Sequence, residues 1–315
     1  MASIHKPVML EEIIRYLQPK KGDLFVDCTL GGGGYSLALA KAVGKTGKVL
    51  GIDLDAEAIA RVEKKKKELK IDNLILEQGN FRDLKEIVSR HFPNKQKFNG
   101  IVFDLGLSSD QLADQSRAFS FSSPGQLDMS FGPESDFNNT RDIINRWSSQ
   151  RLEEVIKDFS QERFAKRIVQ AILTKRRQSR IETAVQLAEI ISEAVPKKFW
   201  PRNIHVATKT FQALRIATNE ELKNIEIVLP QTVDLLISQG RLAVVSFHSL
   251  EDRIIKNYFR NETRDCICPP AAPSCICGHK ASLKILIKKG LIASEEEIKV
   301  NPRSRSARLR LVEKI

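Results

Sequence analysis

Residues 24–40 read LFVDCTLGGGGYSLALA, and this stretch decides the fold. Its first four residues favour a short buried strand, the four glycines favour a turn, and the residues from Ser36 onward favour a helix. Three further strand-like segments follow at even spacing, at residues 49–53, 74–77 and 101–104. Because short apolar strands that alternate with helices are typical of βαβ units, the sequence predicts an α/β domain with a parallel sheet.

A long helical segment interrupts this alternation. Residues 113 to about 138 are rich in Ser, Gly, Pro, Asp and Phe, which favours a loop, and apolar residues then recur at helical spacing from Thr140 to Leu236. The next strand-like segment is 241–247. The predicted domains are a sheet domain of residues 1–112 and 222–315 and an inserted, mainly helical substrate-recognition domain of residues 113–221.

The composition is that of a folded protein. Of the 315 residues, 42% are hydrophobic and 29% are charged, so the chain can bury a sizeable core. No apolar run approaches the roughly 18 residues that a membrane-spanning helix needs. The first seven residues resemble neither a signal peptide nor a transit peptide. We therefore expect a cytoplasmic protein.

The net charge of +12 is concentrated in one half of the chain. Residues 1–150 contain 21 Lys and Arg against 20 Asp and Glu, whereas residues 151–315 contain 30 against 19. A basic half favours an acidic partner, most simply a phosphate backbone, but it is equally typical of a surface charged for solubility. The run Lys64–Lys67 is interpreted as the solvated face of a helix.

Four of the five cysteines form one cluster, Cys266, Cys268, Cys275 and Cys277. A disulfide framework would spread its cysteines through a small chain, so this cluster indicates either a metal site or no function. Two Cys-x-Cys pairs with prolines between them could wrap one Zn²⁺, although their spacing is tighter than that of ordinary zinc fingers.

The glycine-rich turn has the features of a cofactor site. At Gly31–Gly34 a backbone without Cβ atoms can approach a ligand closely, and Asp53 ends the second strand, where a carboxylate can accept both hydroxyls of a ribose. The dinucleotide fingerprint requires glycine where Ser36 stands, and the acidic Asp27 suits a cationic ligand better than a pyrophosphate. These features favour S-adenosylmethionine, with Phe81 either flanking its adenine or belonging to the core.

Asp104 ends the fourth strand, where a small-residue turn follows. A carboxylate at this edge can accept hydrogen bonds from an exocyclic amine, which frees the nitrogen lone pair and stabilises the developing positive charge. Carbon-5 methylation would instead require an attacking thiolate, and Cys28, expected in the strand-end turn, is poorly placed for it. The pattern therefore favours methylation of an amine.

Over essentially its whole length, the chain resembles one family: ribosomal RNA small subunit methyltransferase H, the bacterial rRNA cytosine-N4 methyltransferases. The resemblance is carried by an ordered series of motifs. These are His5–Val8, Asp27–Ser36, Asp104–Leu112, Arg117–Phe121, Leu127–Met129, Glu162–Ile168, Thr210–Ile216, Asn219–Leu222, Ser246–Arg253 and Asn301–Ala307.

The resemblance implies a Rossmann-like, S-adenosylmethionine-dependent methyltransferase that methylates N4 of a specific cytidine in the decoding centre of 16S rRNA, within the small ribosomal subunit. A homodimer is a candidate assembly. The cofactor positions that it implies are Gly33, Gly34, Tyr35, Asp53, Phe81, Asp104 and Gln111. Four positions depart from the family's usual residues: Tyr35 (usually His), Ala118 and Gln161 (usually Gly) and Ser130 (usually Arg). None of them removes a carboxylate, so activity is still expected.

Three further residues are candidates for the active site. His248 follows the fifth strand, where it is either catalytic or a hydrogen-bonded structural histidine. Arg215 and Asn219 lie four residues apart on one predicted helix face. They either reach the target nucleotide, Arg215 binding RNA and Asn219 acting in catalysis, or fix the inserted domain to the sheet domain.

The C-terminal segment 303–310 contains four arginines, but its alternation predicts a strand rather than a disordered RNA-binding tail. Ala307, Leu309 and Leu311 would face the sheet while the arginines between them face outward. Arg303 and Arg305 precede the alternation, where they could bind rRNA phosphate.

Two other functions use the same sequence features. One is a non-catalytic ribosome-assembly factor that binds rRNA and keeps the cofactor turn as a relic, although the intact Gly31–Gly34, Asp53 and Asp104 argue against decay. The other is an amino-methyltransferase that acts on another nucleic acid. Cofactor binding separates the first from an enzyme, and a comparison of substrates separates the second.

Overall fold

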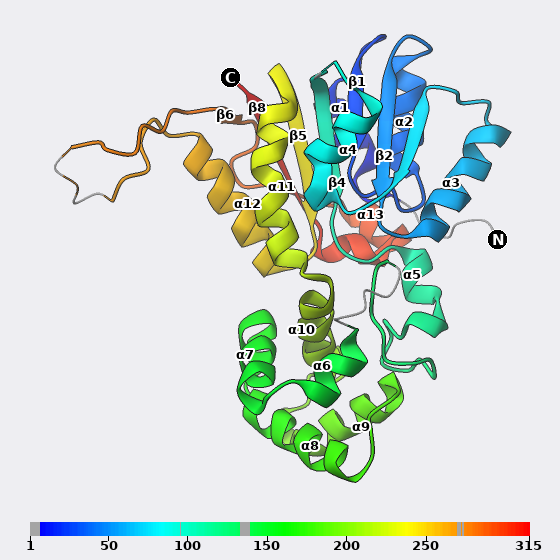
Figure 1. Ribbon diagram of the computed structural model, residues 1–315, viewed down its shortest axis with the longest axis vertical. Helices are drawn as coiled ribbons and strands as arrows, with labels where there is room; N and C mark the ends of the chain where they lie inside the picture. The colour runs from blue at the N-terminus through cyan, green and yellow to red at the C-terminus, as the bar shows by residue number, and fades with distance from the viewer. Residues whose placement is uncertain (1–6, 95, 133–138, 270–271, 273) are drawn as a thin grey trace. The chain divides into compact units, whose positions relative to one another are not determined.

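The computed structural model describes residues 7–94, 96–132, 139–269, 272 and 274–315 (Figure 1). His5 and Lys6 of the first motif lie outside this range. The chain divides into two compact units, residues 1–108 with 222–315 and residues 109–221. The predicted boundary after residue 112 falls inside a helix, α5 (Ser109–Ala113), that belongs to the second unit. In the described part of the chain, no helix is long and apolar enough to cross a membrane.

The first unit is built on one mixed sheet in the order β3-β2-β1-β4-β5-β8-β6, with β7 paired to β8. Its strands are β1 (Leu24–Asp27), β2 (Lys48–Asp53), β3 (Leu74–Gln78), β4 (Phe98–Asp104), β5 (Leu236–Ser246), β6 (Leu283–Ile285), β7 (Leu291–Ile292) and β8 (Arg308–Lys314). The first five strands pair in parallel, and β8 runs antiparallel to β5. The predicted parallel sheet is therefore confirmed. The sheet also has an antiparallel edge, of which the sequence indicated only the last strand, β8.

Helices cover both faces of this sheet, because successive strand residues point to opposite sides. Val26 and Ile101 belong to a core with α4 (Leu84–His91), α11 (Glu221–Leu235) and α12 (Ser249–Glu262). Their neighbours Phe25 and Val102 belong to a second core with α1 (Leu10–Leu17), α2 (Gly34–Val43) and α3 (Ala56–Glu68). Both cores hold the carboxyl ends of the parallel strands in place.

One prediction about the C-terminal strand is wrong. Leu309 and Leu311 are buried in β8, as the alternation predicts, but Arg310 is only 7% exposed. Its Nε and Nη2 donate to Oδ1 and Oδ2 of Asp252 on α12, at 2.6 and 3.0 Å. Because α12 covers this face of β8, the arginine is neutralised by a carboxylate there and does not face solvent.

The second unit is helical, as predicted. Its longer helices are α6 (Thr140–Arg146), α7 (Ser149–Ser160), α8 (Ala165–Gln178), α9 (Ala184–Ala194) and α10 (Thr208–Asn219). The apolar residues predicted at helical spacing differ in burial. Ile168, Ile172 and Leu187 are fully buried, whereas Phe164 is half-buried beside Phe199. The aliphatic residues therefore form this unit's core.

Candidate functional site

Three carboxylates end three neighbouring strands of the first unit. Asp27 ends β1, Asp53 ends β2 and Asp104 ends β4, and β1 lies between the other two strands. Parallel strands end at the same edge of a sheet, so the order β2-β1-β4 brings these side chains to one site. Such a concentration of negative charge suits a cationic ligand.

The glycine turn is packed against its surroundings as well as open to a ligand. Gly33 has φ +80°, and a Cβ atom there would lie 2.8 Å from Cγ2 of Val62; at Gly34 it would lie 2.5 Å from Cγ of Pro7. Only glycine fits at these two positions, whatever binds. Lys65 Nζ donates to the carbonyl of Gly32 at 3.0 Å, so one lysine of the run 64–67 supports this turn, which corrects its interpretation as a purely solvated face.

Asp53 fixes the turn and keeps room for a ligand. Its Oδ2 accepts from the Gly31 N–H at 2.7 Å and its Oδ1 accepts from the Asp55 N–H at 2.9 Å. Each carboxylate oxygen has capacity for a second hydrogen bond, so this partly exposed side chain can still accept hydrogen bonds from two ribose hydroxyls. Burial raises its pKa to about 6, more strongly than these two hydrogen bonds lower it.

Asp27 lies beneath the turn rather than on its surface. It is completely buried, and it accepts hydrogen bonds from Ser36 Oγ at 2.7 Å and from the Thr29 N–H at 3.2 Å. Burial raises its pKa to about 6, and the nearby charge of Asp53 adds to this effect. Asp27 therefore shapes the turn, and because it is completely buried it could act on a cationic ligand only through its electrostatic field.

Asp104 is the most strongly perturbed carboxyl group of the site. Burial raises its pKa to about 8, and the charges of Asp27, Glu251 and Glu297 act in the same direction. The hydroxyl of Tyr35 donates to its Oδ2 at 3.5 Å and opposes the shift. Its own N–H donates to Oγ1 of Thr29 at 2.6 Å. A carboxyl group with a pKa near neutrality can exchange a proton with a substrate.

Tyr35 and Phe81 border this site from two sides of the glycine turn. Tyr35 is 2% exposed, and its hydroxyl shares one proton between Oδ2 of Asp104 and the carbonyl of Val8, which is the nearer acceptor. Phe81 begins the short helix η1 (Phe81–Asp83) after β3 and packs edge-on against Phe103, with ring centroids 5.6 Å apart. Phe81 is half-buried, so it has a core contact and also a face that remains for a ligand.

His248 caps the helix that follows β5. Its Nδ1 accepts from the Glu251 N–H at 3.5 Å, and its Nε2 lies 3.1 Å from Oε1 of Glu251. Oε2 of Glu251 accepts from the His248 N–H at 3.3 Å, which completes a capping box at the start of α12, and it also accepts from the Phe247 N–H at 2.8 Å. These contacts are those of the structural alternative, and the catalytic role of His248 stays a prediction.

The candidates of the second unit organise its own loops. Asn219 accepts from the Phe131 N–H at 2.9 Å and donates to the Met129 carbonyl at 2.8 Å. Arg215 donates from Nε and Nη2 to the two oxygens of Glu221, at 2.8 and 2.9 Å. Gln111 lies in α5 and is 8% exposed. Their predicted contacts with RNA or cofactor remain untested.

Two of the four departures from the family pattern occupy left-handed backbone. Ala118 has φ +54° and Gln161 has φ +51°, a region that favours glycine. The family's usual glycine is therefore explained by conformation at both positions. Ser130 instead donates to Oδ1 of Asp128 at 2.7 Å. None of these three residues belongs to the unit that carries the carboxylates.

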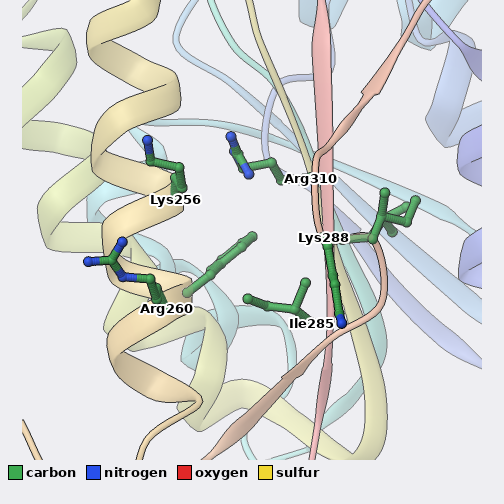
Figure 2. A pocket seen from close by; sticks show the side chains of 8 residues that line it. Lys256, Arg260, Ile285, Lys288 and Arg310 are labelled. Atoms are coloured by element: carbon green, nitrogen blue, oxygen red, sulfur yellow. The ribbon is translucent and has the colours of Figure 1, made fainter.

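Basic side chains gather on the C-terminal half of the first unit. A hollow of about 150 Å³ lies between α12 and the β6–β8 edge (Figure 2). Lys256 and Arg260 border it from α12, and Lys288 borders it from the opposite side; its lining also includes Phe259 and Ile285. Arg303 and Arg305 lie in η4 (Pro302–Ser306), directly before β8, as the sequence predicts.

Sequence reasoning missed several residues that shape the site. Thr29 binds the backbone of Asp104, Ser36 binds Asp27, and Glu251 joins β5 to α12. Thr29 and Ser36 lie within the glycine motif, and this position was the only sequence feature that could have indicated their contacts with the site. The capping role of Glu251 depends on a contact with His248 that spacing alone does not reveal.

Comparisons with known proteins identify the family of this chain. Residues 2–315 match the family described as the MraW methylase family. A Thermomicrobium roseum protein named ribosomal RNA small subunit methyltransferase H is 44% identical over 315 residues, covering 100% of this chain and 95% of that protein. A Heliobacterium mobile protein of the same name is 40% identical over 311 residues, covering 99% of each. The solved structure of an rRNA methylase from Streptococcus thermophilus covers 100% of this chain and 99% of that one, but its TM-score of 0.46 at 11% identity carries no argument.

Proposed function

The chain belongs to the MraW methylase family, and on that premise we propose that it transfers a methyl group from S-adenosylmethionine to N4 of a cytidine in small-subunit rRNA. The family membership makes the chain a methyltransferase. The observation that carries the finer proposal is Asp104, a carboxyl group with a pKa of about 8 at the end of β4, beside β1, which ends in Asp27.

The residues at the strand ends fit S-adenosylmethionine. Asp53 binds the two ribose hydroxyls with its remaining acceptor capacity, and the half-buried face of Phe81 packs on the adenine. Burial raises the pKa values of Asp27, Asp53 and Asp104, and repulsion between Asp27 and Asp53 and between Asp27 and Asp104 adds to the shifts of Asp27 and Asp104. A ligand that carries a sulfonium and an ammonium relieves that repulsion. When bound, the cofactor supplies a methyl group made electrophilic by the positive sulfur.

Asp104 prepares the amine for attack. Its ionised carboxylate accepts a hydrogen bond from the exocyclic N–H, which draws the nitrogen lone pair out of conjugation with the ring. The lone pair forms the bond to the methyl carbon while the methyl–sulfur bond breaks, and that electron pair goes to sulfur as a thioether. The methylated nitrogen carries one proton too many, and Asp104 accepts it. The step needs no covalent nucleophile, and the buried Cys28 is not used.

The substrate is the finer part of the proposal. The relatives' name specifies small-subunit rRNA, and the excess of Lys and Arg in residues 151–315 suits a phosphate backbone. Arg303 and Arg305, together with Lys256, Arg260 and Lys288 around the hollow, are proposed phosphate contacts. We assign the target to the decoding centre of the small subunit, and we assign Arg215 to RNA binding and Gln111 to the cofactor. Asn219 and His248 remain proposed catalytic residues.

Methyl transfer from labelled S-adenosylmethionine tests this function. Assembled small ribosomal subunits, naked 16S rRNA and duplex DNA are offered in parallel, and the methylated nucleosides are identified by mass spectrometry after digestion. The proposal expects N4-methylcytidine in rRNA, and the Asp104→Ala variant serves as the inactive control. Methylated DNA or adenine would instead indicate an amino-methyltransferase of different substrate. Cofactor binding without transfer to any of these nucleic acids would contradict the proposal, and no cofactor binding would indicate the non-catalytic assembly factor.

A further inference from the structure

We propose that Cys266, Cys268, Cys275 and Cys277 bind one Zn²⁺, which holds together the exposed loop between α12 and β6. The four Sγ atoms all lie within 4.8 Å of one another. Cys275 and Cys277 bring theirs to 3.6 Å, and Cys277 lies 3.8 Å from Cys266. This site takes no part in the proposed methyl transfer and stands or fails separately from it.

The sulfur–sulfur distances are those of a tetrahedral metal site. A Zn–S bond is about 2.3 Å long, so the sulfurs at the corners of a ZnS₄ tetrahedron lie roughly 3.8 Å apart. A disulfide would require about 2.05 Å between its two sulfurs. The cluster therefore has the spacing of four ligands around one ion and not that of two bonded pairs.

Hydrophobic burial does not explain why the thiols converge. Both isoleucines of the segment point outward, Ile276 with 88% of its surface exposed and Ile267 with 46%. Three of the four cysteines are themselves exposed. In a loop folded by apolar contacts, the isoleucines would be inside and the polar groups outside. Here the isoleucines lie outside, so apolar burial does not hold the segment together, as in small metal-binding segments whose free energy of folding comes from the ligand.

The base of the loop already holds the ligands in register. The Ser282 N–H donates to the carbonyl of Glu262, the last residue of α12, at 2.8 Å. The Ala281 N–H donates to Oδ1 of Asp265 at 3.3 Å. These bonds bring the two ends of the loop together, so the first cysteine pair faces the second before any ion binds. The entropic cost of assembling four ligands is correspondingly lower.

Zinc is the ion that this set of ligands favours. Four thiolates in a tetrahedron are typical of Zn²⁺ or of iron, and zinc needs no redox partner. On binding, each thiol releases its proton to water as its sulfur bonds to the ion. Arg264 and Lys280 flank the cluster in sequence and offset part of the net negative charge of the four thiolates.

Metal analysis of the full chain tests the site. Protein purified in reducing buffer, without added metal or chelator, is expected to contain about one zinc per chain. The double variant Cys266→Ser, Cys277→Ser is expected to contain less than a tenth of that, whereas Ile276→Ser keeps all four thiols and should retain the full amount. Circular dichroism checks that each variant is folded. If the double variant does not fold, the wild-type chain is tested instead, with Co²⁺ exchanged for zinc. Tetrahedral thiolate coordination then gives sulfur-to-cobalt charge-transfer bands.

A second readout follows the loop itself. Trypsin should cut beside Arg264 or Lys280 at least about tenfold faster after zinc is removed by a chelator, and zinc added back should restore resistance. The proposal is overturned if reduced protein takes up no zinc when one equivalent is supplied. It is equally overturned if the four thiols are found as two disulfides without metal, or if iron occupies the site as purified.

Discussion

The hydroxyl of Tyr35 lies 3.5 Å from Oδ2 of Asp104 and also donates to the carbonyl of Val8. One phenol thus joins the start of α2 to the end of β4, across the glycine turn. Burial raises the pKa of Asp104 to about 8, and the hydrogen bond from Tyr35 keeps it from rising higher. Tyr35 therefore helps to keep Asp104 ionised in a site that favours its protonated form.

Replacing Tyr35 with Phe should move the pH profile of methyl transfer to higher pH. The ring keeps its packing, but Asp104 loses a donor, so its pKa rises and less of it is ionised at neutral pH. At pH 7 the rate should fall severalfold, and much of it should return near pH 9. Tyr16→Phe, which removes a phenol from α1, is the matched control and should leave the profile unchanged. A uniform loss of rate at every pH would argue that Tyr35 acts only through packing.

Cofactor affinity should increase as the pH rises from about 5 to about 8.5. The folded-state pKa values of Asp27 and Asp53 are about 6, against 3.8 for an ordinary aspartate, and that of Asp104 is about 8. A folded-state pKa above the unfolded value means that the folded chain binds more protons, so the unliganded protein loses stability as the pH rises through this window. A cationic ligand favours the ionised carboxylates, and binding should release protons.

Calorimetry in buffers of different ionisation enthalpy measures that proton release. S-adenosylhomocysteine, which lacks the sulfonium charge, is the matched ligand and should show a shallower pH dependence. Equal slopes for the two ligands, or a binding enthalpy that does not depend on the buffer, would show that the carboxylates do not respond to the cofactor's charge.

Gln161→Gly should stabilise the protein by about 1 kcal/mol. Gln161 ends α7 with φ +51°, a conformation that glycine adopts without the steric strain of a Cβ atom. Glycine also gives the unfolded chain more conformational entropy, but this destabilising effect is smaller than the strain that is relieved. Lys157→Gly, an exposed position inside the same helix, should instead destabilise by a similar amount. Chemical denaturation compares the two variants, and a loss of stability in both would reject the left-handed cap.

Arg303 and Arg305, which lie in η4 directly before β8, should contribute to RNA binding. Replacing both with Ala should weaken binding and reduce the slope of affinity against salt by about two phosphate contacts. The control Lys41→Ala, Lys45→Ala removes the same charge from exposed positions in the nearly neutral half, residues 1–150, and should leave the slope unchanged. Leu309→Ala, in the buried face of β8, should cost about 2–4 kcal/mol of stability and spare the slope. Unfolding caused by the arginine pair would refute this division of roles.

Much of the fold was accessible from local pattern. Strand Leu24–Asp27, the glycine turn and Asp53 follow the βαβ rule, because each strand's alternation and each turn's glycines are properties of neighbouring residues. The short strands β6 and β7 were not predicted, since a strand of two or three residues has too few positions to show a period.

Contacts between distant residues account for what the sequence could not predict. Arg310 was expected in solvent because its own strand alternates, and nothing local shows that Asp252 on α12 would cover it. The raised pKa of Asp104 likewise depends on burial in the folded chain, and the charges of Asp27, Glu251 and Glu297, which are far apart in the sequence, add to it. His248 remains ambiguous for the same reason, because capping and catalysis both place a histidine at a strand end.

The most direct test of the account is the methylation state of small-subunit rRNA in cells. Deletion of this chain should remove one N4-methylated cytidine from the decoding-centre RNA, detected by mass spectrometry of nuclease fragments. Wild-type protein should restore that modification, and Asp104→Ala, expressed at the same level, should not. An unchanged rRNA modification pattern after deletion would contradict the proposed function, as would full restoration by Asp104→Ala.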